Sequence, residues 1–236
     1  MPINEHGQPI GDAQTHWTAR PRPSRDPMQG RTCRLKALDP QRHAADLFSA
    51  TALDTSGANW TYLAIGPFAD YASFLAWVRT ASVSEDPLFF AVVDAQTGKA
   101  TGVAAYMRID PANGVIEVGS INFSPLLQRT RAATEAMFLM MRRAFDELGY
   151  RRYEWKCDAL NAPSRAAALR LGFSYEGLFR QALIYKGRNR DTAWFSILDG
   201  EWPALKSAYE HWLDADNFDA DGKQRVALAS MISAER

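Results

Sequence analysis

Regular patterns of apolar and polar residues begin near residue 32 and predict the first elements of a fold. The segment 33–38 alternates weakly, as a strand does. Asp39-Pro40 then fits the start of a helix, because aspartate caps free amides and proline suits the first turn. Apolar residues at helical spacing predict a second helix within 67–81. The run 88–93 is apolar throughout, which predicts a strand buried on both faces.

The pattern continues as further strands and then as strands that alternate with helices. Turns at 97–98 and 111–114 separate strands, and Gly149 ends a long helix with a continuous apolar face. The elements expected after residue 99 are strands over 100–109, 115–123, 153–157, 173–186 and 191–198, and helices over 128–148, 161–171 and 201–213. This order predicts one α+β domain with a mixed sheet.

The two ends of the chain differ from this central domain of residues 32–214. Residues 1–31 are expected to form an irregular arm, because its prolines remove backbone hydrogen-bond donors. Trp17 is an exception within the arm, since so large a ring usually packs against something. Residues 215–236 are expected to form a polar, loosely held tail.

Composition and charge argue against several classes of protein. Lys+Arg and Asp+Glu both number 27, so no overall field favours a nucleic acid or an anionic membrane as partner. Two cysteines favour a reducing compartment, and there is neither a signal-like run nor an apolar stretch of membrane length, so we expect a cytoplasmic protein. His43 has no partners at metal-ligand spacing, and no metal is expected. A nucleotide-binding protein is disfavoured because no P-loop lysine and no Gly-x-Gly-x-x-Gly after a strand is present.

The strand, loop and helix over 115–149 carry the strongest indication of function. The strand ends in Phe123-Ser124-Pro125, and the helix is expected to begin near Gln128. The first amides of a helix have no intrahelical partner and lie at the positive end of its dipole, so they bind phosphate well. Arg129 and Arg131 could add charge there. The alternative is a capped surface helix with two solvated arginines.

Two motifs in this part of the chain resemble a known family. Gln128-Arg129-Thr130-Arg131-Ala132-Ala133 is similar to the acetyl-CoA signature of the GNAT superfamily, and the residues after it resemble the ribosomal-protein-alanine N-acetyltransferase branch. Arg131 stands where the family prefers glycine, which costs ~1 kcal/mol if that position needs a positive φ. Downstream, Asn161-Ala162-Pro163-Ser164 and the Leu-Gly-Phe at 171–173 resemble the family element that lines the pantetheine arm.

The resemblance implies an α+β, single-domain GNAT-like fold. Its mixed, mostly antiparallel sheet would have about seven strands flanked by helices, splayed between strands 4 and 5. The activity implied is transfer of an acetyl group from acetyl-CoA, as co-substrate, to a primary amine by direct attack in a ternary complex. The residues implied in cofactor binding are Asn122 and Phe123 through their backbones, the cradle Gln128, Arg129, Thr130, Arg131, Ala132 and Ala133, and Asn161 and Ser164.

Glu117 is the first candidate for the general base. By alternation it shares a face with Gly119, Ile121 and Phe123 until a bulge resets the phase. A salt-bridged strand glutamate is the alternative, and Asp158 is a second candidate base that could equally cap the next helix. Ser164 could donate a proton to the leaving thiolate or only satisfy its own backbone, and Tyr175 is another candidate acid.

The acceptor is least determined by the sequence. Trp60, Tyr62 and Phe68 lie in the segment that shapes the acceptor site in GNAT proteins, although some of these rings are expected in the core. Because Asp70 is the only acid within 58–77, we expect a peptide α-amine or a small-molecule amine rather than a polyamine. A catalytically weak acyl-CoA-binding or sensing module on the same fold is the alternative function.

Overall fold

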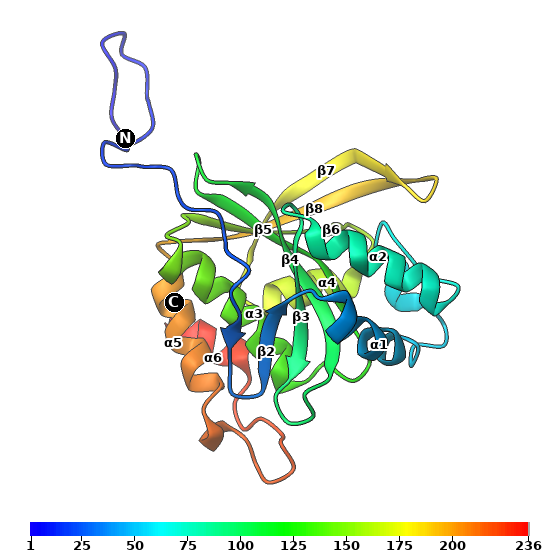
Figure 1. Ribbon diagram of the computed structural model, residues 1–236. Helices are drawn as coiled ribbons and strands as arrows, with labels where there is room; N and C mark the ends of the chain where they lie inside the picture. Colours follow the sequence, from blue (N-terminus) through cyan, green and yellow to red (C-terminus); the bar gives the residue numbers. More distant parts are fainter. Residues whose placement is uncertain (236) are drawn as a thin grey trace.

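Residues 1–235, which this computed structural model describes, form one open sheet of eight strands in the order β1-β2-β3-β4-β5-β6-β8-β7 (Figure 1). All neighbouring strands are antiparallel except β5 and β6, which are parallel. The strands are β1 Met28–Gln29, β2 Cys33–Ala37, β3 Leu88–Asp94, β4 Ala100–Asp110, β5 Val115–Phe123, β6 Arg152–Asp158, β7 Ser174–Tyr185 and β8 Arg188–Leu198. The predicted mixed, mostly antiparallel α+β sheet is confirmed; its eighth strand is the short edge strand β1.

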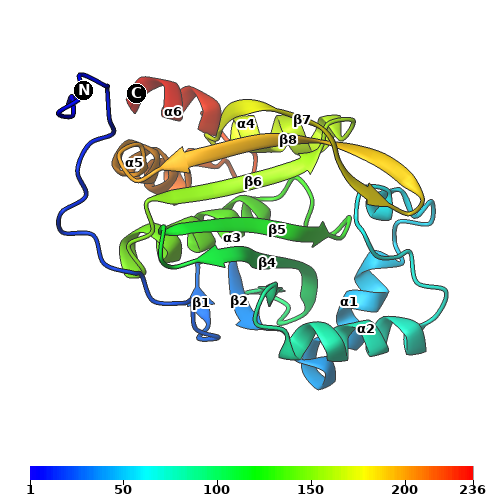
Figure 2. The same cartoon turned by 90° about the horizontal axis from the view of Figure 1, so that it is seen from above.

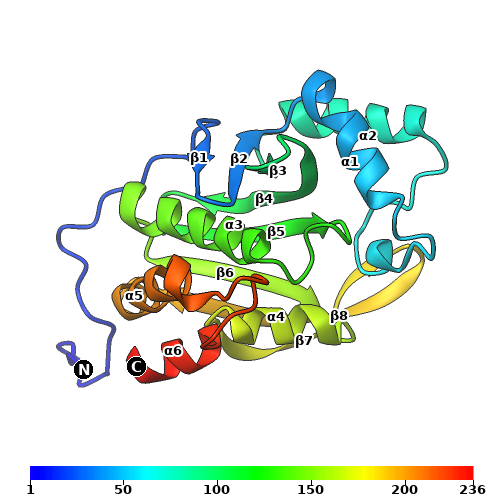
Figure 3. The same ribbon diagram turned by 90° about the horizontal axis from the view of Figure 1, so that it is seen from below.

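Helices cover both faces of this sheet and form two cores. One core packs α1 Pro40–Thr51 and α2 Tyr71–Val83 on the first half of the sheet. The other lies under α3 Arg131–Arg142, α4 Ala162–Arg170, α5 Trp202–Trp212 and α6 Leu228–Glu235, which Figure 3 shows in front of the strands. Strand β3 alternates between the two cores, so the prediction of a strand buried on both faces is confirmed.

Local sequence explains where the helices begin. Asp39 caps α1, accepting hydrogen bonds from the amides of Gln41 and Arg42, as predicted from Asp39-Pro40. The long helix predicted after residue 128 is divided: α3 ends at Arg142 and a π-helical turn, Arg143–Glu147, continues it. None of the helices within residues 1–235 is long and apolar enough to cross a membrane.

The N-terminal arm is irregular up to β1, but side chains of the domain hold it in place. The Trp17 indole donates to the carbonyl of Ala112 at 2.7 Å. The guanidinium of Arg143 is 93% buried and donates to the carbonyl of Asp26 at 2.6 Å. Tyr150 donates to the carbonyl of Pro21 at 3.1 Å. From Trp17 onward the arm therefore follows the domain as an extended segment fixed at several carbonyl groups, whereas the loop before it projects away from the domain (Figure 1).

A buried carboxylate joins helix α3 to the start of β2. Glu135 is only 4% exposed, and it accepts hydrogen bonds from the amides of Arg31 (2.7 Å), Thr32 (2.6 Å) and Cys33 (3.1 Å). A side chain at Gly30 would come within 2.6 Å of this carboxylate, so glycine leaves the space that the contact needs. These amide donors stabilise the charge in an otherwise apolar setting.

The C-terminal segment differs from the expected loosely held tail. It contains the 3-10 turn Ala215–Asn217 and helix α6, whose Leu228 and Ile232 are buried in the core beside α5. The buried side chain of Asn217 ties both parts together, since its Nδ2 donates to the carbonyl of Trp212 at 3.1 Å and its Oδ1 accepts the amide of Val226 at 2.9 Å. The expectation of a loose tail is therefore wrong for this part of the chain.

Candidate active site

Strands β5 and β6 separate halfway along their length. Their parallel pairing covers only Val115–Val118 against Arg152–Trp155. Beyond it, β5 continues along β4 as far as Phe123, and β6 continues along β8 as far as Asp158. The backbone of β5 after Val118 thus has no strand partner on the β6 side (Figure 2). This is the predicted splay: β5 and β6 are strands 4 and 5 when counting starts at the strand of residue 33.

A bulge in β5 sets which side chains face the two helical layers. The register with β4 shifts between Ala105 and Val103, and Ser120 within the bulge has a φ of 48°. Ile121 and Phe123 pack against the core under α3. Asn122 instead contacts Asn59 in the segment between α1 and α2. The alternation expected from Glu117 is therefore reset at Ser120.

Glu117 is buried beside two cations. Its side chain is 6% exposed, and its Oε2 lies 2.9 Å from Nζ of Lys156 and 3.3 Å from Nε of Arg108. Burial raises the pKa of Glu117 above its usual value, and the charges of Lys156 and Arg108 only partly oppose this shift. A carboxyl group of this kind can exchange a proton at a higher pH than an exposed glutamate.

Lys156 connects Glu117 to a wider ion-pair network. Its Nζ lies 2.6 Å from Glu154 and 3.8 Å from the ring centre of Trp194. Glu154 forms an ion pair with Arg152 at 2.6 Å, and Arg152 forms a bidentate ion pair with Glu176 on β7. The network contains three acids and three bases when Arg108 is included, so it adds no net charge to the site.

Side-chain amides gather where β5 ends. Nδ2 of Asn59 donates to Oδ1 of Asn122 and, at 3.1 Å, to the carbonyl of Phe123. Nε2 of Gln128 donates to the same carbonyl at 2.8 Å. Nδ2 of Asn122 is buried and has no hydrogen-bond partner within residues 1–235. Such an orphaned donor fits a ligand that brings acceptors, as the amide groups of a pantetheine arm do. Asn59 was missed from the sequence because it lies in a loop without periodicity.

The loop after β5 leaves several amides free. Thr130 is the N-cap of α3, so the helix begins at Arg131 rather than near Gln128. The amide of Ala133 already donates to Oγ1 of Thr130 at 3.1 Å. Within residues 1–235, no hydrogen bond uses the amides of Arg129, Arg131 or Ala132. A left-handed residue followed by free amides at a helix start forms a concave anion-binding turn.

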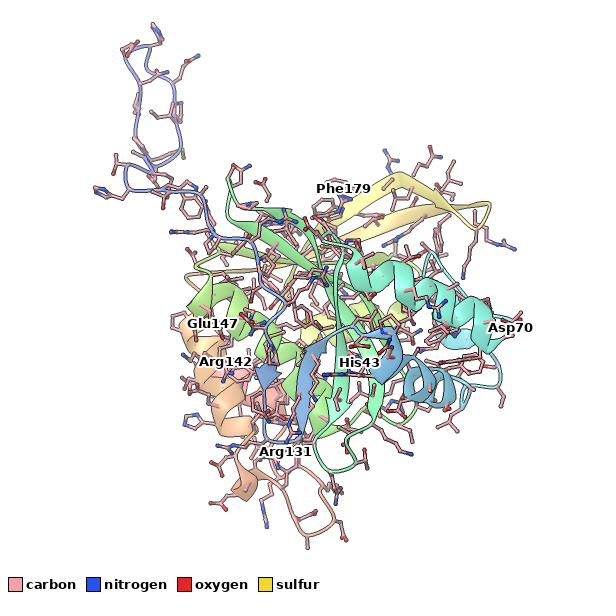
Figure 4. All side chains as sticks on the ribbon, in the orientation of Figure 1. His43, Asp70, Arg131, Arg142, Glu147 and Phe179 are labelled. Carbon is pink, nitrogen blue, oxygen red and sulfur yellow. The ribbon has the colours of Figure 1, made fainter. Side chains whose placement is uncertain are left out.

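Two expectations about the arginines of this loop are corrected. The positive φ, 61°, belongs to Arg129, whereas Arg131 is the first residue of the helix. The Arg131 side chain turns toward the end of α5, donates to the carbonyl of Leu213 and lies 4.2 Å from the ring centre of Phe218 (Figure 4). Its charge is therefore placed at that helix end, and only the exposed Arg129 side chain is free beside the loop.

The residues of the second motif cap helix α4. Oδ1 of Asn161 accepts the amide of Ser164 at 3.1 Å, as an N-cap does. Oγ of Ser164 accepts a hydrogen bond from the indole of Trp155 at 3.0 Å, and its hydroxyl hydrogen-bonds to the Cys157 thiol, which partly opposes the rise in the Cys157 pKa caused by burial. Asp158 accepts hydrogen bonds from the amide of Leu160 and the hydroxyl of Tyr185, both at 2.8 Å. Asp158 thus connects the loop before α4 to the end of β7.

The expected acceptor residues have different surroundings. Trp60 is 5% exposed, and its ring packs edge-on against Phe68 in the core under α1 and α2. Both rings pack in this core, Phe68 only half-buried, and their expected part in lining the acceptor site stays a prediction. Tyr62 reaches across the splay, where its hydroxyl donates to the carbonyl of Leu160 at 3.2 Å.

The hairpin of β7 and β8 completes this end of the site. Nζ of Lys186 at its tip donates to the carbonyl of Trp60 at 2.7 Å. The hairpin, the segment between α1 and α2, and the start of α4 therefore meet around the open end of the splay (Figure 2). Within residues 1–235, no group of three or more His, Cys, Asp or Glu side chains is arranged to hold a metal ion.

Comparison with known proteins agrees with this arrangement. Residues 33–174 match the family described as "Acetyltransferase (GNAT) domain". The crystal structure of a GCN5-related N-acetyltransferase from Brucella melitensis is 54% identical, with a TM-score of 0.91 over 92% of this chain and 99% of that one. An uncharacterized N-acetyltransferase p20 of Bacillus licheniformis is 28% identical over 144 residues, 60% of this chain and 80% of that protein.

A more distant structure shares the fold alone. It is the microcin C7 self-immunity acetyltransferase in complex with acetyl-CoA and AMP, which is 21% identical with a TM-score of 0.63 over 72% of this chain and 93% of that one. The family match itself runs from β2 to the start of β7 and includes the splay and both loops. The chain therefore belongs to the GNAT family and is an acyl-CoA-dependent N-acetyltransferase.

Proposed function

We propose that the protein transfers the acetyl group of acetyl-CoA to a primary amine, either a peptide α-amine or a small-molecule amine, by direct attack in a ternary complex. The observation that carries this proposal is the position of Glu117. It is buried, it has a raised pKa, and it lies next to the point where β5 loses its partner β6. A base at this point would lie close to both substrates.

The residues around the splay fit acetyl-CoA. The free amides of Arg129, Arg131 and Ala132 would hold its pyrophosphate, with Gln128, Thr130 and Ala133 shaping the same turn. The β5 backbone at Asn122 and Phe123, which has no strand partner on the β6 side, would bind the pantetheine arm from one side, and Asn161 and Ser164 would bind it from the other. The distant microcin C7 relative, solved with acetyl-CoA, supports this use of the fold.

The transfer would then require a proton acceptor and a proton donor. The neutral amine attacks the thioester carbonyl, forming the C–N bond, and the C–S bond breaks as the coenzyme A thiolate leaves. Glu117 takes the amine proton, directly or through water, and the hydroxyl of Ser164 would turn from the Cys157 thiol to donate to the thiolate. An amide of the unpaired β5 backbone would stabilise the oxyanion.

The charges around the acceptor opening favour a weakly basic amine. Holding an amine neutral at pH 7 costs about 4.6 kcal/mol for a lysine side chain and about 1.4 kcal/mol for an α-amine. The ion-pair network is balanced, and Asp70 is already engaged as the cap of α2. Nothing among these residues would attract a polycation, so spermidine is expected to be a poor substrate.

A panel assay at pH 7 tests this proposal. Release of coenzyme A would be followed with peptides bearing free α-amines, aromatic amines, amino acids and spermidine. We expect the highest kcat/KM for an α-amine or an aromatic amine. A panel in which spermidine has the highest kcat/KM would refute the acceptor assignment while leaving acetyl transfer itself intact.

The alternative, a catalytically weak acyl-CoA-binding module, is favoured by one observation. Two cations lie beside Glu117 and could hold its carboxylate too firmly for proton exchange. Calorimetry with acetyl-CoA, run beside the same panel, separates the two functions. Tight binding without release of coenzyme A for any amine would support the module.

A further inference from the structure

We propose that a second site, a basic groove on the face of the sheet opposite α3, binds a phosphorylated small molecule such as a nucleotide. The groove is open to solvent, has a volume of about 900 Å³ and lies between the N-terminal arm, β2, α1 and α2. Its volume is in the range of small-molecule sites. Figure 4 shows His43 of this groove on α1 beside β2, while Asp70 marks the far end of the same helical layer.

The groove concentrates positive charge in a protein that has none overall. Four cations line it, each from a different element: Arg25 of the arm, Lys36 of β2, Arg42 of α1 and Arg79 of α2. Asp39 is the only acid in the lining. Since the whole chain carries 27 basic and 27 acidic residues, this local excess is a property of the groove. Several converging cations are the usual means of binding phosphate groups.

These cations differ in how far they are engaged, and Arg42 lies 3.7 Å from Asp39 at the exposed start of α1. Lys36 and Arg79 form no ion pair within residues 1–235. Arg25 is fixed at the groove wall, because its guanidinium donates to the carbonyls of Ser82 (2.9 Å) and Ser84 (2.7 Å). The carboxylate of Asp39 already accepts the amides of Gln41 and Arg42, so it is engaged as a helix cap.

His43 adds a hydrogen-bond donor to the groove. Its side chain lines the groove although the residue is only 5% exposed. Nδ1 accepts the amide of Asp39 at 3.1 Å, so the proton of the neutral ring is on Nε2. This Nε2–H forms no hydrogen bond within residues 1–235 and is not among the buried polar atoms that lack a partner, so it is open to the groove. A phosphate oxygen held in the groove by the four cations could accept this Nε2–H.

The rest of the lining suits a phosphorylated organic molecule. Tyr71, Leu75 and Pro27 add an aromatic ring and apolar surface next to the cations. A ligand with both phosphate groups and a flat apolar part would use the whole groove. The acetyl-CoA cradle is a separate feature, because the free amides at the start of α3 belong to the other face of the sheet.

Calorimetry with pyrophosphate, ATP and adenosine tests the proposal. One molar equivalent of coenzyme A is added first, so that the cradle is filled. We expect pyrophosphate and ATP to bind with 1:1 stoichiometry and adenosine to bind far more weakly. The double variant Lys36→Gln/Arg79→Gln should weaken binding roughly tenfold or more. The matched control Lys99→Gln/Arg225→Gln removes the same charges elsewhere and should leave the affinity unchanged.

Two substitutions at His43 separate its donor from its packing. His43→Asn keeps an acceptor for the Asp39 amide but does not reach the Nε2 position, whereas His43→Gln reaches it. We expect weaker ATP binding for the first and partial retention for the second. Absence of saturable binding of pyrophosphate and ATP, or equal weakening by the control variant, would overturn the proposal. So would adenosine binding as tightly as ATP. Each result is independent of acetyl transfer.

Discussion

The ammonium group of Lys156 lies 2.9 Å from Oε2 of Glu117, and both side chains are only 6% exposed. Burial favours the protonated form of Glu117, whereas this neighbour favours the ionised form. The balance between the two effects sets the pH at which Glu117 can accept a proton. Lys156 was not singled out in the sequence, yet its position makes it the partner that controls the candidate base.

Replacing Glu117 by glutamine tests the base directly. The change is nearly isosteric, so acetyl-CoA should bind with nearly unchanged affinity, while kcat should fall by about 10²–10⁴-fold. Steady-state kinetics and calorimetry measure the two effects. The exposed Glu5→Gln serves as control. Unchanged kcat across the pH range would show that Glu117 is structural.

Replacing Lys156 by methionine should shift the pH dependence of turnover. The raised pKa of Glu117 should rise further without its cation, so the acidic limb of the kcat profile should move to higher pH. Lys156→Arg keeps the charge and should leave the limb close to its original position. If both variants shift the limb equally, the charge of Lys156 does not act on Glu117.

The free energy of unfolding should also depend on the protonation of Glu117, in a direction that follows from its raised pKa. Burial holds the folded-state pKa of Glu117 above its usual value, so protonation of Glu117 favours the folded state. This contribution is present at low pH and is lost as the pH rises through the folded-state pKa. Thermal unfolding of the wild type and of Glu117→Gln between pH 4 and 8 checks the sign. As the pH rises, the midpoint of the wild type should fall relative to that of the variant.

The loop at the start of α3 should respond in opposite directions to two changes. Thr130→Ala removes the N-cap and should cost ~1 kcal/mol of stability. Arg129→Gly removes a side chain from a φ of 61° and should stabilise the fold by about 1 kcal/mol. Thermal denaturation measures both. Equal loss of stability in the two variants would contradict the assignment of left-handed backbone to Arg129.

The buried carboxylate of Glu135 should contribute strongly to stability. Glu135→Gln leaves one acceptor oxygen and places an amino group against backbone donors, so we expect a loss of about 3 kcal/mol. For a chain of this size the midpoint of thermal unfolding should fall by roughly 6–12 °C. Glu5→Gln is again the control, and a shift below about 2 °C would contradict the role assigned to Glu135.

Local patterns predicted the elements of the sheet well because each element depends on a few residues that are close together in the sequence. The apolar run of β3, the Asp39-Pro40 start of α1 and the strand–loop–helix after Val115 are examples. The features that the sequence did not predict depend on contacts between segments that are far apart in the chain. Asn59 reaches the end of β5 from a loop, and α6 is fixed by burial of Leu228 and Ile232. Neither contact leaves a periodic signal.

The candidate site was less accessible to sequence reasoning for the same reason. The motif around Gln128 indicated a cradle, but the start of α3 depends on which residue caps it, and Thr130 does so. Arg131 follows the helix and so points toward the end of α5. The sequence indicates only the segment that contains the acceptor residues. The fold distinguishes Tyr62, which crosses the splay, from Trp60, which is packed in the core.

The docked arm has a consequence for the kinetics of folding. Arg143 and Asp26 are 117 positions apart in the chain, and Trp17 and Ala112 are 95 apart. Contacts that close such long loops carry a large entropic cost and form after the local elements. Interactions absent from the transition state affect mainly the rate of unfolding. The arm therefore prolongs the lifetime of the native protein without making that state form faster.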